Sequence, residues 1–288
     1  MGTVTWSGTL TALSSISHGG KSLGTRTMLR REVVFSPDGR RVQVPLVSGN
    51  HLRGRLRRVG EELLRDTLAY EGEISPAAAH FLRGGGALAK TSGEPLSGSR
   101  LARLRELVPH VGVFGGAGGG TIVSGALSVG KVIPHVAETA RITGVAADVG
   151  VFDATQLEAY TRRDETDQHD FTGVVALETD ARLVFDESGS PEVVGGGQMQ
   201  FLVETFPAGT VFSTWLTLSR PSDLELAFFV DVLDAYTASG RLGGRVAIGH
   251  GLVRTRLVPD HDPQPAADWR TVAVEHRQEI LEVLGTLG

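Results

Sequence analysis

Residues 47–58, VSGNHLRGRLRR, join a run typical of a strand to a run typical of a helix. The preceding residues, RVQVPLV, favour a strand, and Asn50 is a residue type often found at a helix N-cap. Five apolar residues then recur at helical spacing: Leu52, Leu56, Val59, Leu63 and Leu64. Four arginines lie within the eight residues after Asn50. The stretch therefore predicts an amphipathic helix that begins in a dense block of positive charge.

The charge is unevenly distributed along the chain. The 288 residues carry a net charge of −5, yet residues 1–60 hold ten Lys/Arg and two Asp/Glu, a balance of +8. The remaining residues hold 18 basic and 31 acidic groups, a balance of −13. One region is thus suited to a polyanion while the rest would repel it.

The composition is that of an ordinary globular protein, with 41% hydrophobic and 21% charged residues. The chain contains no cysteine, which excludes disulfides, thiolate metal sites and cysteine nucleophiles. No apolar run is long enough to cross a bilayer, and MGTVTWSGTLTAL lacks the features of a secretion signal. We expect a cytoplasmic protein with no membrane partner, built as a single domain over residues 1–288.

The order of predicted elements indicates an α+β fold. Residues 3–13 alternate like a strand, and two strands flank the SPDGR turn. SSISHGGKSLGT is read as a loop, TIVSGALSVGKVIPHV as one long strand, and MQFLVETF with TVFSTWLTLS as a hairpin. Short helices are expected near residues 75 and 99–107, then a helix after Pro221, a last strand ending near Leu257 and a helix at about 268–286. Without insertions, this order predicts a ferredoxin-like, RRM-like antiparallel sheet with two helices on one face.

Two readings of the arginine block remain open. A helix start offers unpaired N–H groups to an anion, and Arg53 and Arg57 share one helix face that could contact successive phosphates. Arg55 and Arg58 would then point elsewhere. The alternative is a solvated helix face balanced by nearby acidic residues.

Three further loops are candidates for contact with an anion. SISHGGKSLGTR holds His18, Lys21 and Arg26 and no carboxylate. GVFGGAGGG, with Gly115 and Gly116, lacks the P-loop Lys-Ser/Thr, so it is read either as a flexible connection or as a close approach to a ligand. GRLGGRVAIGHG could bring Gly243, Gly244 and Arg245 to a phosphate, or could simply form a turn.

The pattern offers no convincing active site and implies no cofactor or metal. Only RRDETDQHD, residues 162–170, is dense in possible metal ligands, and its spacing is that of a solvated acidic loop. No Ser-His-Asp or H-E-x-x-H pattern stands out.

Taken together, the motifs resemble those of the RAMP superfamily. PLVSGNHLRGRLRR resembles its strand-to-helix motif, ETFPAGTVFSTWLTL its paired strands, and GRLGGRVAIGHGLV its C-terminal glycine-rich loop. SISHGG and VGVFGGAG match two further segments, in the right order. Within this superfamily the chain is most similar to backbone subunits of class 1 CRISPR effector complexes, and to type IV among them.

The resemblance implies a palm at about 3–69, 121–140 and 199–257, a finger-like insertion at about 70–120 and a thumb-like insertion at about 141–198. It implies copies that stack head to tail along a guide RNA (crRNA), with other effector subunits as partners and a target nucleic acid bound by guide pairing. The positions that it assigns to RNA are the following: His18, Lys21, Arg26, Ser48, Asn50, His51, Arg53, Arg57, Gly115, Gly116, Gly243, Gly244 and Arg245.

The first loop lacks the aspartate with which type III backbone subunits cut RNA, so the resemblance implies binding without catalysis. Two other hypotheses stay open. One is a metal-dependent ribonuclease that uses the acidic cluster at 164–170, and the other is a small-molecule binding protein that uses the glycine-rich loops.

Overall fold

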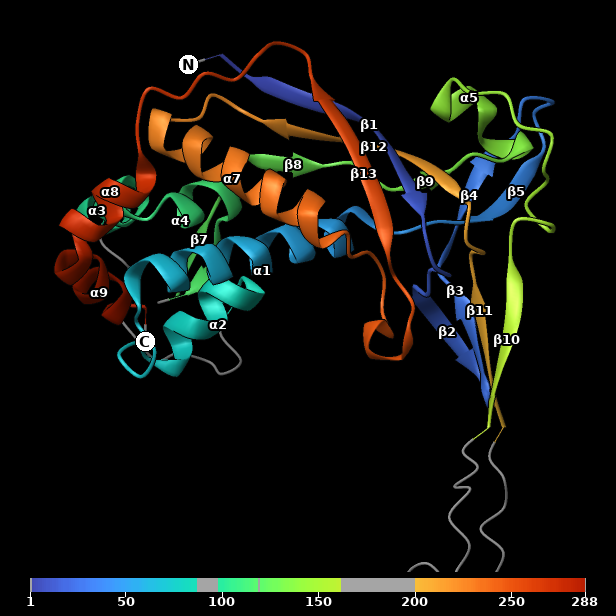
Figure 1. The fold of residues 1–288 in the computed structure, drawn as a ribbon, viewed down its shortest axis with the longest axis horizontal. Coiled ribbons are helices and arrows are strands. Elements are labelled where there is room, and N and C mark those ends of the chain that lie inside the picture. Colours follow the sequence, from blue (N-terminus) through green and yellow to red (C-terminus); the bar gives the residue numbers. More distant parts are fainter. Residues whose placement is uncertain (1, 87–97, 119, 162–199, 288) are drawn as a thin grey trace, which may run out of the picture.

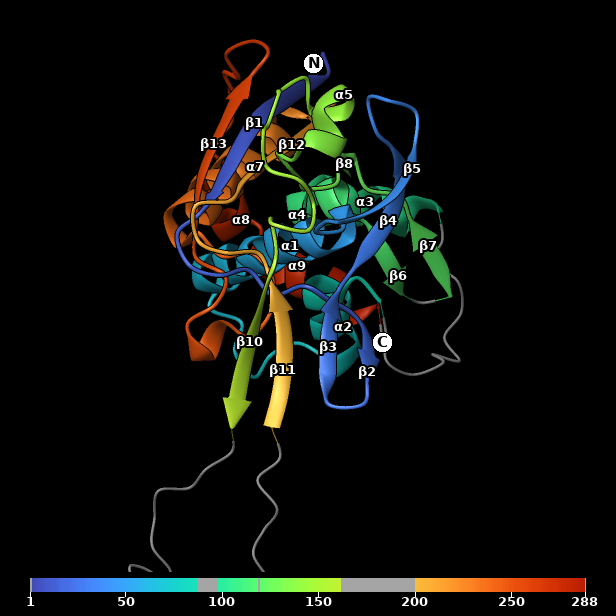
Figure 2. The ribbon, with the colours of Figure 1, turned by 90° about the vertical axis from the view of Figure 1, so that its right-hand side faces the viewer.

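The computed structural model describes residues 2–86, 98–118, 120–161 and 200–287 (Figures 1 and 2). Its main sheet has the strand order β13-β1-β12-β8, with β9 also pairing with β12, and all of these pairs are antiparallel. The strands are β1 (Val4–Ala12), β8 (Leu127–Val129), β9 (Ile133–Pro134), β12 (Val211–Leu218) and β13 (Val253–Pro259).

Two long helices, α1 (Gly49–Leu68) and α7 (Asp223–Ser239), pack together and cover one face of this sheet (Figure 1). Leu52, Leu56 and Leu64 of α1 are buried, as their helical spacing predicted. Trp6 of β1 meets Phe229 of α7 edge to face at 5.2 Å between ring centroids. Along the chain the elements follow the predicted order of strand, helix, strand, strand, helix, strand. The fold is thus a mixed α+β fold, and its core lies between the sheet and the helices.

A group of smaller elements surrounds the far end of α1 (Figure 1). It contains α2 (Pro76–Gly84), α3 (Gly98–Leu107), α4 (Pro109–Phe114), α8 (Trp269–Glu275), α9 (Arg277–Gly285) and the pair β6 (Gly116–Gly118) and β7 (Thr121–Val123). The single C-terminal helix expected at 268–286 is therefore two helices that meet at His276. Arg277 donates a 2.7 Å hydrogen bond to the carbonyl of Leu68, which ties α9 to the end of α1.

A second sheet projects away from the helical body (Figures 1 and 2). Its order is β10-β11-β3-β2, from β2 (Gly19–Leu23), β3 (Arg26–Leu29), β10 (Gln156–Thr161) and β11 (Gln200–Thr205). Strands β4 (Arg31–Phe35) and β5 (Arg41–Pro45) form the hairpin predicted around SPDGR. Short helical turns complete the chain: η1 (Ala137–Thr139), α5 (Ala140–Thr143) and η2 (Val246–Ile248).

Three local predictions are wrong. The expected hairpin of MQFLVETF with TVFSTWLTLS does not form, because β11 pairs with β10 and β3 while β12 pairs with β1 along its whole length. The chain passes from one sheet to the other at Phe206, which forms an isolated antiparallel bridge with Ile16. SSISHGGKSLGT is not all loop, because Gly19–Leu23 forms β2.

The long strand expected over TIVSGALSVGKVIPHV is split into β7, β8 and β9. Gly125 interrupts it where the chain passes against α4, since a Cβ there would lie 2.5 Å from the Val113 carbonyl oxygen. The sequence also predicts a strand at FTGVVALET, residues 171–179, and a loop at DESGSPEVVGGG, residues 186–197, and both segments lie outside the described residues. Among the described residues, no helix has the length and apolar character needed to span a bilayer.

Candidate nucleic-acid interface

The start of α1 is capped by Ser48. Its backbone is extended, with φ −68° and ψ 145°, and its hydroxyl accepts a 3.3 Å hydrogen bond from the His51 N–H. Asn50, which we expected at the N-cap, lies inside the first turn. The predicted place of the strand-to-helix transition is correct, but the N-cap lies two positions before Asn50. The preceding strand β5 ends at Pro45, and Ser48 is the residue that caps the helix.

Three segments far apart in the sequence meet at this helix start. The His18 and His51 rings lie edge to face with centroids 4.9 Å apart. His18 Nε2 accepts from the backbone N–H of Ser48 at 3.3 Å, and His51 Nε2 accepts from the N–H of Gly243 at 2.8 Å. Gly244 extends the contact by donating to the Ser17 carbonyl at 2.7 Å. The first loop, the helix start and the C-terminal glycine loop therefore form one cluster, which we call the His18–His51 cluster.

Both histidines of this cluster are held neutral. Burial lowers the pKa of His51 to about 4, with a smaller contribution from His18, Arg55 and Arg58. Burial also lowers the pKa of His18, and the charge of Arg30 adds to that effect. Each Nε2 must keep its lone pair to accept from a backbone N–H, so the hydrogen bonds agree with the neutral form.

Arg53 and Arg57 do share a helix face, but that face points into the protein. Arg57 is only 5% exposed, and its guanidinium donates to the carbonyls of Phe81, Phe114 and Gly115 at 3.3, 2.6 and 2.8 Å. Arg53 donates to the Phe114 carbonyl at 2.8 Å. Its donors bind the carbonyls of Phe81 in α2 and of Phe114 and Gly115 at the end of α4, so this geometry does not favour the predicted contact of Arg57 with a phosphate.

Arg55 and Arg58 are the cations that this helix start leaves available. Both side chains are partly exposed, and the Nε of each is buried without a hydrogen-bond partner in the described part of the chain. Each lowers the pKa of His51, so both guanidinium charges lie close to the cluster. The sequence reasoning set these residues aside in favour of Arg53 and Arg57. Counting four and seven residues on from His51 would have found them on its helix face.

The other predicted cations lie along the two loops that enter the cluster. Lys21 is exposed on β2, and Arg245 is exposed with φ 56° just after Gly244. Arg26 begins β3, and its Nε is buried with no partner among the described residues. These residues extend the positive charge from the cluster, although the structure does not bring them into direct contact with it.

Gly115 and Gly116 lie where a Cβ would clash with neighbouring atoms. A Cβ on Gly115, whose φ is +58°, would lie 2.2 Å from the Val123 carbonyl oxygen. A Cβ on Gly116 would lie 2.7 Å from the Phe81 ring. Close approach occurs at both positions, but within the protein, between α4, β7 and α2.

A second hydrogen-bonded group connects the glycine loop to the projecting sheet. His250 Nδ1 lies 2.8 Å from the Ser15 hydroxyl, and its Nε2 is hydrogen-bonded to the hydroxyl of Tyr160 on β10. Tyr160 also donates to Glu158 at 2.8 Å. Hydrogen bonds from Thr205 and then Tyr160 hold the pKa of Glu158 at about 2, against the opposing effect of burial. Strand β10 is thereby hydrogen-bonded, near its C-terminal end, to the loop that supplies Gly243.

No group of three potential metal ligands is close enough to hold an ion among the residues that the structure describes. The acidic cluster at 164–170 lies outside those residues, so the ribonuclease hypothesis is not tested by this geometry.

The antiparallel sheets and the helices packed on them define the class, a mixed α+β protein. The chain is similar to one chain of a solved structure described as a type IV-B CRISPR complex, with 33% sequence identity, a TM-score of 0.60, and coverage of 93% of this chain and 96% of that one. At this identity and coverage, the chain belongs to the same family as that type IV-B CRISPR complex subunit. The predicted resemblance to subunits of type IV CRISPR complexes is confirmed.

A second solved structure, Csc2 of Thermofilum pendens, is 13% identical over 98% of this chain and 75% of that one, with a TM-score of 0.42. No protein-family model and no curated protein matches the chain.

Proposed function

We propose that the protein is a non-catalytic backbone subunit of a type IV-B CRISPR ribonucleoprotein. It binds the sugar-phosphate backbone of a guide RNA and stacks on copies of itself along that RNA, together with other effector subunits. The target nucleic acid is recognised by pairing with the guide. The observation that carries the proposal is the His18–His51 cluster, where three of the four anion-binding candidates of the sequence meet at the start of one long helix.

The chemistry of this cluster suits a phosphate backbone better than a base. The start of α1 contributes N–H groups and partial positive charge, and Arg55 and Arg58 add two cations that form no salt bridge within the described residues. The charge of Glu62 acts on Arg58 and partly opposes the lowering of its pKa by burial. Contacts of this kind position a nucleic acid without reading its sequence, which suits a protein that must accept any guide. Lys21, Arg26 and Arg245 extend the same positive surface, whereas Arg57 supports it from inside.

The division into palm, finger and thumb belongs to this proposal. The main sheet with α1 and α7 would be the palm, the segment at about 70–120 the fingers, and the segment at about 141–198 the thumb. The β10–β11 arm supports the last assignment, because it leaves the body as two paired strands (Figure 2) and Tyr160 of β10 is hydrogen-bonded to His250 of the glycine loop.

The proposal is tested by fluorescence anisotropy with a labelled, unstructured single-stranded RNA over a series of salt concentrations. Arg55→Gln/Arg58→Gln should weaken binding and reduce the slope of log K against log salt by roughly 1.4, the value for two lost contacts to a single strand. Arg105→Gln/Arg220→Gln is the matched control, since both arginines are exposed in α3 and in the β12–α7 turn. Equal affinity and slope in the two double variants would overturn the assignment.

A further inference from the structure

The main sheet has a second face, opposite α1 and α7, that we call the open face. Alternation along β1 sends Trp6 and Leu10 into the core and Ser7 and Thr9 to the other side. The same alternation on β12 and β13 places their less buried side chains on the open face. The open face thus consists of Thr5, Ser7, Thr9, Thr11, Ser213, Trp215, Thr217, Arg254, Arg256 and Val258.

Trp215 is the one large aromatic side chain of this face, and its position is fixed. The residue is 46% exposed, although it lies on a central strand of the sheet. The indole lies directly against Gly130, where a Cβ would be 2.6 Å from Nε1. The Gly130 N–H also donates to the Trp215 carbonyl at 2.8 Å. Gly130 therefore leaves the space that holds an exposed aromatic ring in one orientation.

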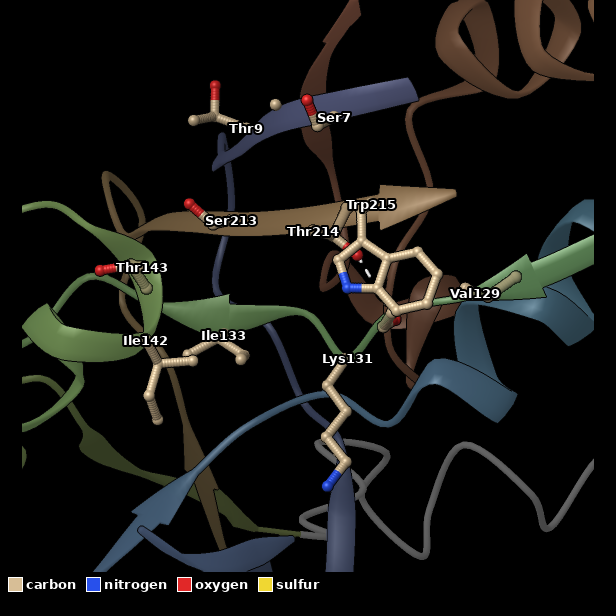
Figure 3. A pocket seen from close by; sticks show the side chains of 12 residues that line it. Ser7, Thr9, Val129, Lys131, Ile133, Ile142, Thr143, Ser213, Thr214 and Trp215 are labelled. Atoms are coloured by element: carbon tan, nitrogen blue, oxygen red, sulfur yellow. Dashed lines mark hydrogen bonds between the residues drawn. The ribbon is translucent and has the colours of Figure 1, made fainter. Parts of the chain in front are cut away.

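Beside this ring lies a pocket of about 620 Å³ (Figure 3). Ser7, Thr9 and Ser213 supply hydroxyl groups from the sheet, and Ile133 and Ile142 supply apolar surface from β9 and α5. Lys131 reaches the rim and is paired with Glu32. The pocket combines a flat aromatic ring, apolar walls and several hydrogen-bonding groups, a mixture that suits a planar heterocycle.

The opposite side of the open face is cationic. Arg256 pairs in register with Thr9, and Thr9 with Ser213, so that these three residues form a row across the sheet. Arg254 lies in the next such row, opposite Thr11. Both arginines are exposed, and neither has an ion-pair partner among the described residues. Two strand spacings, roughly 10 Å, separate the arginine strand from the strand of Trp215.

We propose that the open face binds single-stranded nucleic acid, with a base stacked on Trp215 and the backbone phosphates on Arg254 and Arg256. Stacking platforms beside a cationic track are the general means by which proteins hold single strands. The open-face side chains of β1, β12 and β13 include no carboxylate. This is unexpected for β12 and β13, because they belong to residues 61–288, which carry 31 acidic and 18 basic groups, and it favours a polyanion over a protein surface.

This site is distinct from the proposed guide-RNA site, because α1 packs on the other face of the sheet. A strand bound here could be RNA or DNA, since stacking and phosphate contacts serve both.

Intrinsic fluorescence gives a local test. Trp6 and Trp269 are 3% and 2% exposed, so quenching by a stacked base reports on Trp215. The full-length protein, freed of cellular RNA by nuclease and high salt, is titrated with oligouridylate and separately with oligothymidylate. We expect saturable, salt-sensitive quenching, and the stronger of the two titrations identifies the preferred sugar.

Arg254→Glu/Arg256→Glu should raise the Kd obtained from the quenching titration by about tenfold for each lost charge-assisted contact. Arg105→Glu/Arg220→Glu makes the same change in net charge elsewhere on the protein and should leave the Kd of the quenching titration unaltered. Arg254→Gln/Arg256→Gln repeats the test if the glutamate variant does not fold. Three results would overturn the proposal: no quenching by either oligonucleotide, equal quenching in both double variants, or a Trp215 signal that depends on protein concentration alone, which would mark an interface between copies.

Discussion

The backbone N–H of Gly243 donates a 2.8 Å hydrogen bond to Nε2 of His51, although the two residues are 192 positions apart in the sequence. This bond joins the C-terminal glycine loop to the first turn of α1 and requires the neutral imidazole. The proposed RNA site therefore depends on one long-range contact with a defined protonation state.

Stability should fall as the pH is lowered through the range in which free histidine titrates. His51 has a pKa of about 4 in the fold, well below its ordinary 6.5, so the unfolded state binds the extra proton first. The contribution of neutral His51 is complete above pH 6.5 and is lost progressively as the pH falls towards 4. Buried His110, with a pKa of about 3, acts in the same direction.

Urea unfolding measured at several pH values between these limits checks this prediction. His51→Gln keeps an acceptor for the Gly243 N–H but does not titrate, so its stability should decline less steeply than that of the unchanged protein. An identical pH dependence in the two proteins would show that the Gly243 contact does not control the titration.

The arginines of α1 should differ sharply in their effect on folding. Arg57→Ala removes three hydrogen bonds to buried carbonyls and should cost about 3 kcal/mol or more. Arg53→Ala removes one such bond and should cost about 1 kcal/mol. Arg55→Ala breaks no hydrogen bond or salt bridge within the described residues and should change stability by less than about 0.5 kcal/mol. Denaturant unfolding ranks the three variants, and equal losses at Arg55 and Arg57 would contradict the structure.

The capping assignment predicts a second contrast at the start of the same helix. Ser48→Ala loses the acceptor for the His51 N–H and should cost about 1 kcal/mol. Asn50→Ala lies within the first turn and should be nearly neutral. Thermal unfolding of the two variants decides between Ser48 and Asn50 as the N-cap, and a larger loss at Asn50 would favour the interpretation based on sequence alone.

Two glycines of α1 provide a matched pair. A Cβ at Gly54 would meet no heavy atom within 4 Å, so Gly54→Ala should stabilise the helix by about 0.5–1 kcal/mol. A Cβ at Gly60 would lie 3.0 Å from the Phe228 ring and 3.1 Å from the Phe114 ring. Gly60→Ala should therefore lose that gain and destabilise the protein. Melting temperatures that rise equally in both variants would show that α1 does not pack closely at Gly60.

The sequence predicted the parts of the fold that local patterns determine. Helical spacing found α1, with Leu52, Leu56 and Leu64 in the core, and the Pro-Asp-Gly turn found the β4–β5 hairpin. It also predicted that the first loop, the helix start and the glycine loop belong to one site. That inference needed the order of five motifs together, because no single motif was specific.

Properties that depend on tertiary contacts were not visible in the sequence. Arg57 resembles a surface cation until the carbonyls of Phe114 and Gly115 are brought against it by α4. The sequence predicts a hairpin of β11 and β12 because only a turn separates them. In the structure β11 pairs with β10, and β12 pairs with β1. The exposed Trp215 was missed for the same reason, since its strand pattern does not tell which face the helices cover.

The central claim, an RNA-bound filament, is tested most directly by size-exclusion chromatography with light scattering and absorbance at two wavelengths after expression in bacteria. The account predicts a large assembly that contains RNA, and its conversion to RNA-free, folded protein by Lys21→Glu/Arg245→Glu but not by Arg105→Glu/Arg220→Glu. An RNA-free monomer that stays monomeric when single-stranded RNA is added would contradict it.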